Sequence, residues 1–329
     1  MTTRVRASCI INAVAVIAFG ASCGTICAAE TQYPPRPVRM VVPFAPGGGL
    51  DILARTLSPA LTAATGQTWV VDNRSGAAGN LGAEIAARAN PDGQTVLMAL
   101  NTQLTANPSL YKLSFSAEKD FQPLTMLGTT EHVITLHPGV QAKTLKEFLA
   151  LAKQKPGALN YASAGVGSAI HMAAELLKQR AAIDLVHIAY KGGGPAVAAV
   201  LAGESQVILA TSASAIQFIT AGRLRALATT GPTRSKVLPE LATVAESGYA
   251  GFDTSQWYGA LVPVATPKWI AERIRDELLK AMQHADVRAA LASQGVEPKT
   301  TTPLELAARI KSETAMWASV IKTAGIRAE

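Results

Sequence analysis

The sequence predicts an α/β protein of two domains, each built on a mainly parallel sheet flanked by helices. The chain has 329 residues, which is more than a single core usually holds. Apolar residues make up 49% of it and charged residues 16%, a balance typical of globular proteins. Apolar runs of strand length alternate with helical segments nearly from end to end, as a parallel sheet requires.

The first segment has the pattern of a signal peptide. Arg4 and Arg6 precede the apolar stretch CIINAVAVIAFG, and the following CAAE offers a cleavage point after Ala29. We therefore predict a signal peptide over residues 1–29 and an exported product. A retained N-terminal anchor is the alternative, although the apolar stretch is short for a bilayer.

All three cysteines, Cys9, Cys23 and Cys27, fall within this predicted signal. The mature chain is then expected to lack disulfides, cysteine nucleophiles and thiolate metal sites. Lipid attachment at Cys23 or Cys27 stays open, but neither has a leucine three residues upstream. The formal net charge is +7 with scattered basic residues, which argues against a nucleic-acid partner.

The first half of the pattern begins with strands expected over 38–44 and 68–73. They flank a helix that starts near Asp51, and Pro59 is expected to shorten or kink it. The turn NPDGQ then leads to a strand over 95–100.

The second half opens with a helix over 144–157, where Thr144 and Glu147 form a capping box. A helix over 167–179 with Ser168 as its N-cap follows. Short strands are expected between helices, at 159–163, 184–190, 205–210 and 223–230. Two amphipathic C-terminal helices, 266–282 and 302–321, each have threonine at the N-cap and proline at the first helical position. No linker is visible, so we expect the chain to cross between domains near residues 130 and 252.

Three glycine-rich loops stand between a strand and a helix, at 47–49, 165–168 and 192–194. Ligands of open α/β sheets bind at the carboxyl ends of strands, beside helix N-termini. Free N–H groups and the positive end of the helix dipole favour an anion there. Three such loops together predict a site for a carboxylate or another oxyanion.

Motifs for catalysis are missing from the sequence. It contains no G-x-x-x-x-G-K-[ST], no G-x-S-x-G and no H-E-x-x-H, and we expect no metal or cofactor. An exported enzyme that uses Asp51, His171 or Lys191 as acid or base stays as the alternative. Each has a plainer interpretation: a helix cap, a hydrogen-bonded partner of Glu175, and a solvated lysine.

The sequence resembles the Bug family, the periplasmic solute-binding proteins of tripartite tricarboxylate transporters. The resemblance is collinear over almost the whole mature chain and is carried by these stretches: YPPRPVRMVVPFAPGGGLD, VVDNRSGAAGNLGAE, ANPDGQT, NYASAGVGSAIHMAAELL, AYKGGGPAVAAVLAGE, GRLRALATTGPTRS and WYGALVPVATP. It implies a two-lobed, type II-like clamshell, with residues 31–130 and 253–329 in lobe I and 131–252 in lobe II. It also implies a periplasmic location.

The resemblance further implies a small organic carboxylate held in the cleft by main-chain amides and hydroxyl groups. Carried over position by position, the implied ligand-binding residues are Phe44, Ala45, Gly48, Asp51, Asn101, Thr102, Ser163, Gly165, Gly167, Ser168, His171, Tyr190, Lys191, Gly192, Thr211 and Ser212. The expected partners are that ligand and the membrane subunits of a tripartite tricarboxylate-type transporter, with the protein itself a monomer. A ligand sensor without a role in uptake is a further alternative, since it would use the same clamshell.

Overall fold

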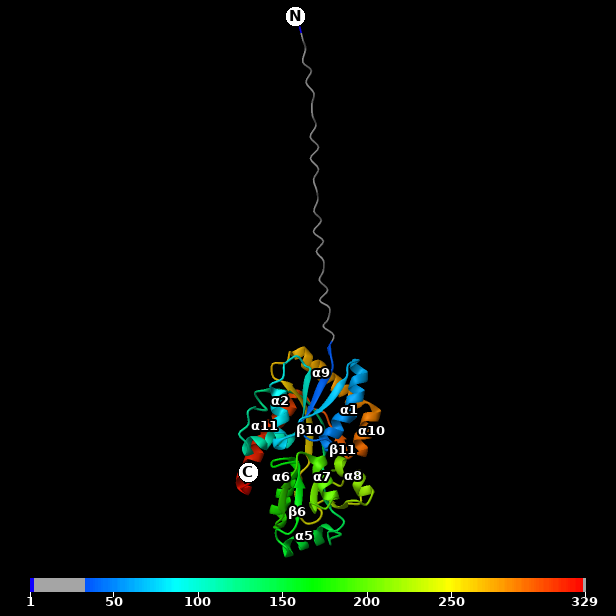
Figure 1. Ribbon diagram of the computed structural model, residues 1–329, viewed down its shortest axis with the longest axis vertical. Helices are drawn as coiled ribbons and strands as arrows, with labels where there is room; N and C mark the ends of the chain where they lie inside the picture. The colour runs from blue at the N-terminus through cyan, green and yellow to red at the C-terminus, as the bar shows by residue number, and fades with distance from the viewer. Residues whose placement is uncertain (3–32, 328–329) are drawn as a thin grey trace. The chain divides into compact units, whose positions relative to one another are not determined.

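The computed structural model describes residues 1–2 and 33–327, of which 33–327 fold around two β-sheets (Figure 1). The predicted signal peptide and its cysteines lie outside the described residues. Across the described ranges, no helix is both long enough and apolar enough to cross a membrane.

The first sheet has six strands in the order β11-β4-β10-β3-β1-β2. Its strands are β1 (Val38–Val42), β2 (Trp69–Asn73), β3 (Thr95–Leu100), β4 (Phe121–Thr130), β10 (Gln256–Pro263) and β11 (Val296–Pro298). The helical segments of this half are α1 (Gly49–Thr65), η1 (Ala77–Gly79), α2 (Asn80–Ala87), α3 (Asn101–Thr105), α4 (Asn107–Leu110), α9 (Lys268–Gln283), α10 (Ala285–Ser293) and α11 (Pro303–Ala324).

The second sheet has five strands in the order β7-β6-β8-β5-β9. Its strands are β5 (His132–Leu136), β6 (Asn160–Ser163), β7 (Val186–Ala189), β8 (Val207–Thr211) and β9 (Arg225–Thr229). The helices of this half, which Figure 1 draws in green and yellow-green, are α5 (Leu145–Gln154), α6 (Ala169–Ala181), α7 (Gly193–Leu201) and α8 (Ser212–Thr220).

Both sheets are mixed, which corrects the expectation of mainly parallel sheets. In the first, β1 pairs parallel with β2 and β3, but β10 runs antiparallel to β3 and β4. In the second, β6 pairs parallel with β7 and β8, but β5 runs antiparallel to β8 and β9. Parallel neighbours need a crossover connection, usually a helix. The strands β5 and β10 are reached from the other sheet instead, and both pair antiparallel.

The chain passes between the sheets over a very short distance. β4 ends at Thr130 and β5 begins at His132, so Glu131 alone separates them. The Glu131 carboxylate accepts hydrogen bonds from the hydroxyl groups of Ser212 and Ser235, at 3.0 and 2.6 Å. The chain returns to the first sheet at β10. Each sheet with its helices therefore forms one lobe, and Glu131 lies on a connection between them.

The helix caps follow the sequence pattern in three of four helices. The side chains of Thr144, Ser168 and Thr302 each accept a hydrogen bond from the backbone N–H three residues later. Helix α9 instead starts one residue later than expected, with Pro267 as its N-cap in place of Thr266.

Helix α1 runs without interruption through Pro59, which corrects the expectation that this proline shortens the helix. Pro59 lies on the exposed side of α1, whereas Leu53, Leu57 and Leu61 are fully buried on the opposite side. Water can therefore solvate the carbonyl group that loses its intrahelical partner. Burial of the leucines contributes about 1.5–3 kcal/mol each and holds the helix on the sheet.

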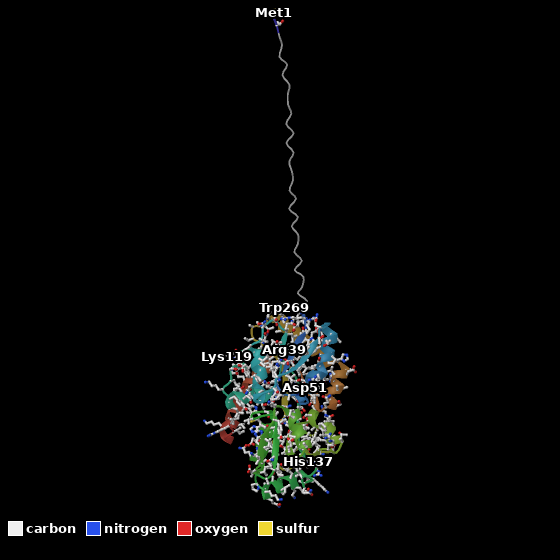
Figure 2. All side chains as sticks on the ribbon, viewed as in Figure 1. Met1, Arg39, Asp51, Lys119, His137 and Trp269 are labelled. Atoms are coloured by element: carbon white, nitrogen blue, oxygen red, sulfur yellow. The ribbon has the colours of Figure 1, made fainter. Side chains whose placement is uncertain are left out.

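The two lobes touch along the edge where the glycine loops lie. Phe44 and Leu50 of the first lobe belong to the same apolar cluster as Ala164, Ile170 and Val197 of the second. In Figure 2, Asp51 lies where the lobes meet, Arg39 lies within the first lobe and His137 within the second. In the described conformation, apolar side chains of the two lobes are in contact.

Candidate ligand-binding site

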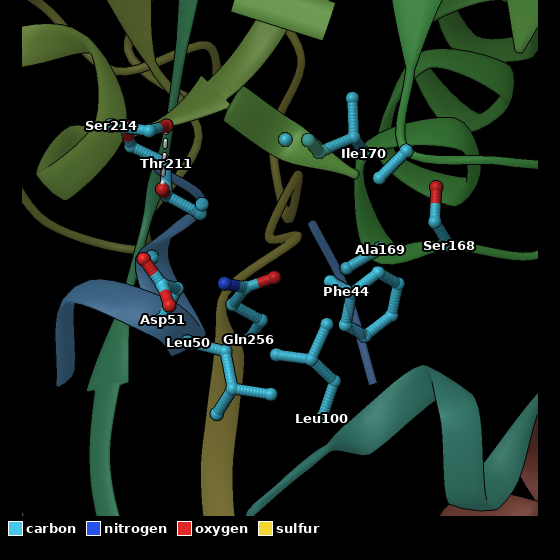
Figure 3. A pocket seen from close by; sticks show the side chains of 14 residues that line it. Phe44, Leu50, Asp51, Leu100, Ser168, Ala169, Ile170, Thr211, Ser214 and Gln256 are labelled. Atoms are coloured by element: carbon cyan, nitrogen blue, oxygen red, sulfur yellow. Dashed lines mark hydrogen bonds between the residues drawn. The ribbon is translucent and has the colours of Figure 1, made fainter. Parts of the chain in front are cut away.

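A cavity lies between the lobes, at the carboxyl ends of β1, β6 and β8 (Figure 3). Its volume of about 30 Å³ leaves room for about two water molecules. The residues that line it are Phe44, Gly48, Gly49, Leu50, Asp51, Leu100, Ala164, Ser168, Ala169, Ile170, Gly193, Thr211, Ser214 and Gln256. None of them is lysine, arginine or histidine, so any positive potential in the cavity comes from backbone N–H groups.

Three helix N-termini supply those N–H groups. The cavity is lined by the first residues of α1, α6 and α7, with Gly48, Ser168 and Gly192 as the respective N-caps. The first residues of a helix have no intrahelical acceptor for their N–H groups. Within residues 33–327, no hydrogen bond takes up the N–H groups of Gly49 and Leu50 in α1 or of Ala169 and Ile170 in α6. Donors from both lobes therefore converge on one small volume.

The first loop is shaped by Asp51, the third residue of α1, which is 3% exposed. Its carboxylate accepts the backbone N–H of Gly47 at 3.0 Å. Arg55 Nε donates to both carboxylate oxygens at 3.0 Å, and Asn73 Nδ2 donates to one of them at 3.0 Å. Asp51 lines the cavity, but its charge is paired and its oxygens are occupied. This arrangement suits a residue that fixes the loop.

The second loop is held by two side chains that lie behind it. Ser163 Oγ accepts the N–H of Gly165 at 3.1 Å and lies 2.5 Å from His187 Nε2. His171 Nδ1 accepts the N–H of Gly167 at 3.2 Å. Burial in the first place, and the neighbouring His187 in the second, lower the pKa of His171 to about 4, so the imidazole is neutral at neutral pH. A neutral ring is required, because a protonated Nδ1 has no lone pair to accept with.

The third loop packs directly on the first. Ala45 donates its backbone N–H to the carbonyl oxygen of Lys191 at 3.2 Å. Gly194 lies so close to the carbonyl oxygen of Pro46 that a Cβ at this position would overlap with it. The Lys191 side chain is exposed, and Tyr190 directs its hydroxyl group toward Glu204 at 3.5 Å. Of this loop, Gly193 lines the cavity.

Polar side chains of both lobes form one wall of the cavity. Gln256 Nε2 donates to the hydroxyl oxygen of Tyr258 at 2.8 Å, and the hydroxyl groups of Thr211 and Ser214 lie 2.9 Å apart. Figure 3 shows Thr211, Ser214, Gln256 and Asp51 on one side of the cavity, with Phe44 and Ile170 on the other. Burial raises the pKa of Tyr258, so its hydroxyl group stays protonated and able to donate.

The cavity brings together five of the residues that the resemblance implies: Phe44, Gly48, Asp51, Ser168 and Thr211. The others lie beside or behind the loops: Ala45, Asn101, Thr102, Ser163, Gly165, Gly167, His171, Tyr190, Lys191, Gly192 and Ser212. Asn101 and Thr102 follow Leu100 into α3 and are almost fully buried. Ser212 points to Glu131 at the connection between the lobes.

Sequence reasoning missed Gln256 and Ser214 as cavity residues. Ser214 stands three residues after Thr211 at the start of a helix, a spacing typical of capping contacts. Gln256 is the first residue of β10, whose other residues are mostly apolar, and it lies far along the chain from the glycine-rich loops. Among the described residues, no group of three or more His, Cys, Asp or Glu side chains lies close enough to hold a metal ion.

Comparison with known proteins gives the same family that the sequence resembles. Residues 53–326 match the family described as "Tripartite tricarboxylate transporter family receptor". Protein BugT of Bordetella pertussis is 33% identical over 300 residues, which are 90% of this chain and 91% of BugT.

Two solved structures share the fold closely. The structure of the periplasmic binding protein BugD has a TM-score of 0.85 and 32% identity, with 90% of this chain and 100% of that chain covered. MatC from Rhodopseudomonas palustris with bound malate has a TM-score of 0.84 and 29% identity, with 88% and 100% covered. The prediction of a two-lobed clamshell is confirmed by these likenesses. The chain belongs to the Bug family, the receptors of tripartite tricarboxylate transporters.

Proposed function

We propose that this protein binds a small organic carboxylate in the cavity between the lobes and delivers it to the membrane subunits of a tripartite tricarboxylate-type transporter. The observation that carries the proposal is the convergence of the N-termini of α1, α6 and α7 on a cavity without a basic side chain. Fixed N–H groups bind an anion without the desolvation penalty of a buried lysine. The malate bound in MatC supports a small organic carboxylate as the ligand.

The ligand contacts we propose are backbone N–H groups and hydroxyl groups. The carboxylate would accept from the N–H groups at 48–50 and 169–170 and from Gly193, with Thr211, Ser214 and Gln256 as side-chain partners. Charge-assisted hydrogen bonds contribute about 1.5–3 kcal/mol each. Several of them from two lobes give the ligand its preference for the closed form.

The binding cycle we propose is a hinge motion. The described cavity has room for about two water molecules, so an organic acid both enters and is held with the lobes further apart than they are here. We place lobe I at 31–130 with 253–329 and lobe II at 131–252, so that Glu131 moves with the hinge. A ligand that contacts both lobes favours the closed form, and this form is the one presented to the membrane subunits.

The carboxylates and bases that an enzyme would use are engaged elsewhere in the described residues. Asp51 is paired with Arg55, His171 accepts from Gly167, and Lys191 is exposed and does not line the cavity. We therefore propose that the bound acid leaves unchanged. We also propose that residues 1–29 act as the signal that exports the chain to the periplasm, where it works as a monomer.

Calorimetry with malate and a thermal-shift panel of mono-, di- and tricarboxylates test the proposal. We expect one class of acid to bind, to raise the melting temperature and to leave the protein chemically unchanged. No binding by any member of the panel, or conversion of the bound acid in a mass spectrum, would overturn it.

A further inference from the structure

The two loops that face each other across the cavity are fixed in the same way. In α1 the third helical residue, Asp51, accepts the N–H of Gly47, the residue before the N-cap. In α6 the third helical residue, His171, accepts the N–H of Gly167, which again precedes the N-cap. Both glycines have positive φ, +84° and +82°, a conformation that glycine adopts without strain.

This arrangement occupies the N–H group that precedes each N-cap. Gly47 and Gly167 have their N–H groups occupied by a side chain of the following helix, and neither residue lines the cavity. The residues that come after them, 48–50 and 168–170, all line it. Of these residues, Gly49, Leu50, Ala169 and Ile170 have N–H groups with no acceptor within residues 33–327, whereas Ser168 donates its N–H to the carbonyl oxygen of Gly165 at 3.1 Å.

The two acceptors differ in chemistry. Asp51 is a carboxylate paired with Arg55, whose Nε lies 3.0 Å away. His171 is an imidazole in a ring stack, with its centroid 4.4 Å from that of His187, which itself lies 4.8 Å from that of Tyr161. A proton on His171 Nδ1 would remove the acceptor for Gly167 and place a cation against the stack.

The groups that act on His171 come from three elements. Glu175 and Lys178 lie on its own helix, His187 on β7 and Tyr161 on β6. Burial is the main cause that lowers the pKa of His171 to about 4, and the charge of His187 acts in the same direction, whereas Glu175 opposes it. Helix α3, which also packs on α6, carries no titratable residue.

We propose that Asp51 and His171 are paired positioning residues that aim the amides of the two lobes at the ligand, and that acid releases the loop of the second lobe through protonation of His171. The effect of this release on ligand binding rests on the proposed carboxylate function. The release of the loop itself has a readout without any ligand.

The first experiment follows the protein without ligand by NMR between neutral pH and the acid side of the His171 pKa. The imidazole of His171 and the amide of Gly167 are expected to titrate together, near the pKa of about 4. An amide of Gly167 that does not follow His171 would overturn the inference.

Two variants make this test specific. In His171→Asn, the side-chain oxygen stands close to the former Nδ1 and cannot be protonated, so the Gly167 amide should no longer titrate. In His187→Gln, the neighbouring imidazole is gone while a polar atom remains near Ser163. The shared midpoint should then move to higher pH, because a group that disfavours the protonated ring has been removed.

The second experiment measures malate affinity by calorimetry. We expect His171→Ala to weaken binding about fivefold at neutral pH, and His171→Asn to recover most of the loss. At a pH equal to the His171 pKa, wild type should lose about twofold more affinity than His171→Asn, since half of its rings are protonated. Equal acid losses in both proteins would overturn the inference, because protonation of the ligand affects both alike. If malate and the other acids fail to bind at neutral pH, the proposed function fails, and the amide titration still decides this inference.

Discussion

Ala45 and Lys191 are joined by a backbone hydrogen bond of 3.2 Å that links the first glycine loop to the third. The two residues lie in different lobes, so we expect this bond to break when the lobes move apart. The glycines around it allow the backbones to meet: a Cβ on Gly192 would lie 2.8 Å from Ala45 N. Gly192 and Gly194 therefore allow close contact between the lobes, and this is a separate role from binding the ligand.

We expect Gly194→Ala to hold the lobes apart. Its Cβ would overlap with the carbonyl oxygen of Pro46, which is backbone and has little room to retreat. Malate affinity should fall more than about tenfold, because the binding-competent closed form is depopulated. Small-angle scattering should show that added ligand no longer compacts the protein.

Gly48→Ala is the matched variant for this prediction. A Cβ at Gly48 would lie 3.6 Å from Gly193 N, an ordinary contact, and its φ of −82° suits any residue. Its loss of affinity should be clearly smaller than that of Gly194→Ala. Equal losses would show that the two glycines act through the ligand and not through closure.

We expect Asp51→Ala to destabilise the protein by about 1–3 kcal/mol, because Gly47, Arg55 and Asn73 all lose their acceptor. Asp51→Asn keeps one acceptor oxygen and should lose less. Urea denaturation measures both differences. If the two variants were equally stable, the charge and not the hydrogen bond to Gly47 would be what holds the loop.

Acid should weaken the fold through His132. This histidine is fully buried, and burial lowers its pKa from 6.5 to about 4, although the carbonyl group of Thr254, 3.0 Å from Nδ1, opposes the shift. Between these two pKa values the unfolded chain binds more protons than the folded one. The stabilisation is therefore complete above about pH 6.5 and is lost as the pH falls through about 4.

The measurement is the urea midpoint across this pH window. Each such histidine contributes a slope of up to about 1.4 kcal/mol per pH unit, and His171 adds to it in the same direction. His132→Asn should flatten the slope. An unchanged slope in this variant would mean that His132 does not titrate with unfolding.

The local features of this fold could be predicted from the sequence. The caps at Thr144, Ser168 and Thr302 are decided by residues three or four apart, and the structure has them where the pattern predicts them. The antiparallel strands were not predictable in this way. Their direction depends on where the chain crosses between the lobes. The hydrophobic periodicity within a strand does not indicate where these crossings occur.

The same distinction applies to the site. Phe44, Gly48 and Ser168 lie at junctions between a strand and a helix that glycine marks in the sequence. The roles of His171 and Gln256 depend on neighbours from other segments. The resemblance implies a contact of His171 with the ligand. In the structure, His171 does not line the cavity, and its Nδ1 accepts a hydrogen bond from the backbone N–H of Gly167.

The last prediction concerns Tyr258, which is fully buried on β10 beneath the cavity. Its hydroxyl group accepts from Gln256 at 2.8 Å and faces Thr211 and the start of α1 at Gly49. Tyr258→Phe keeps the ring and leaves Gln256 without its partner. Since an unpaired buried polar group costs about 1–3 kcal/mol, we expect a loss of stability in that range together with weaker malate binding. The double variant Tyr258→Phe with Gln256→Leu removes both partners and should recover stability but not affinity. If the double variant recovered affinity as well, Gln256 would be part of the scaffold and not of the ligand site.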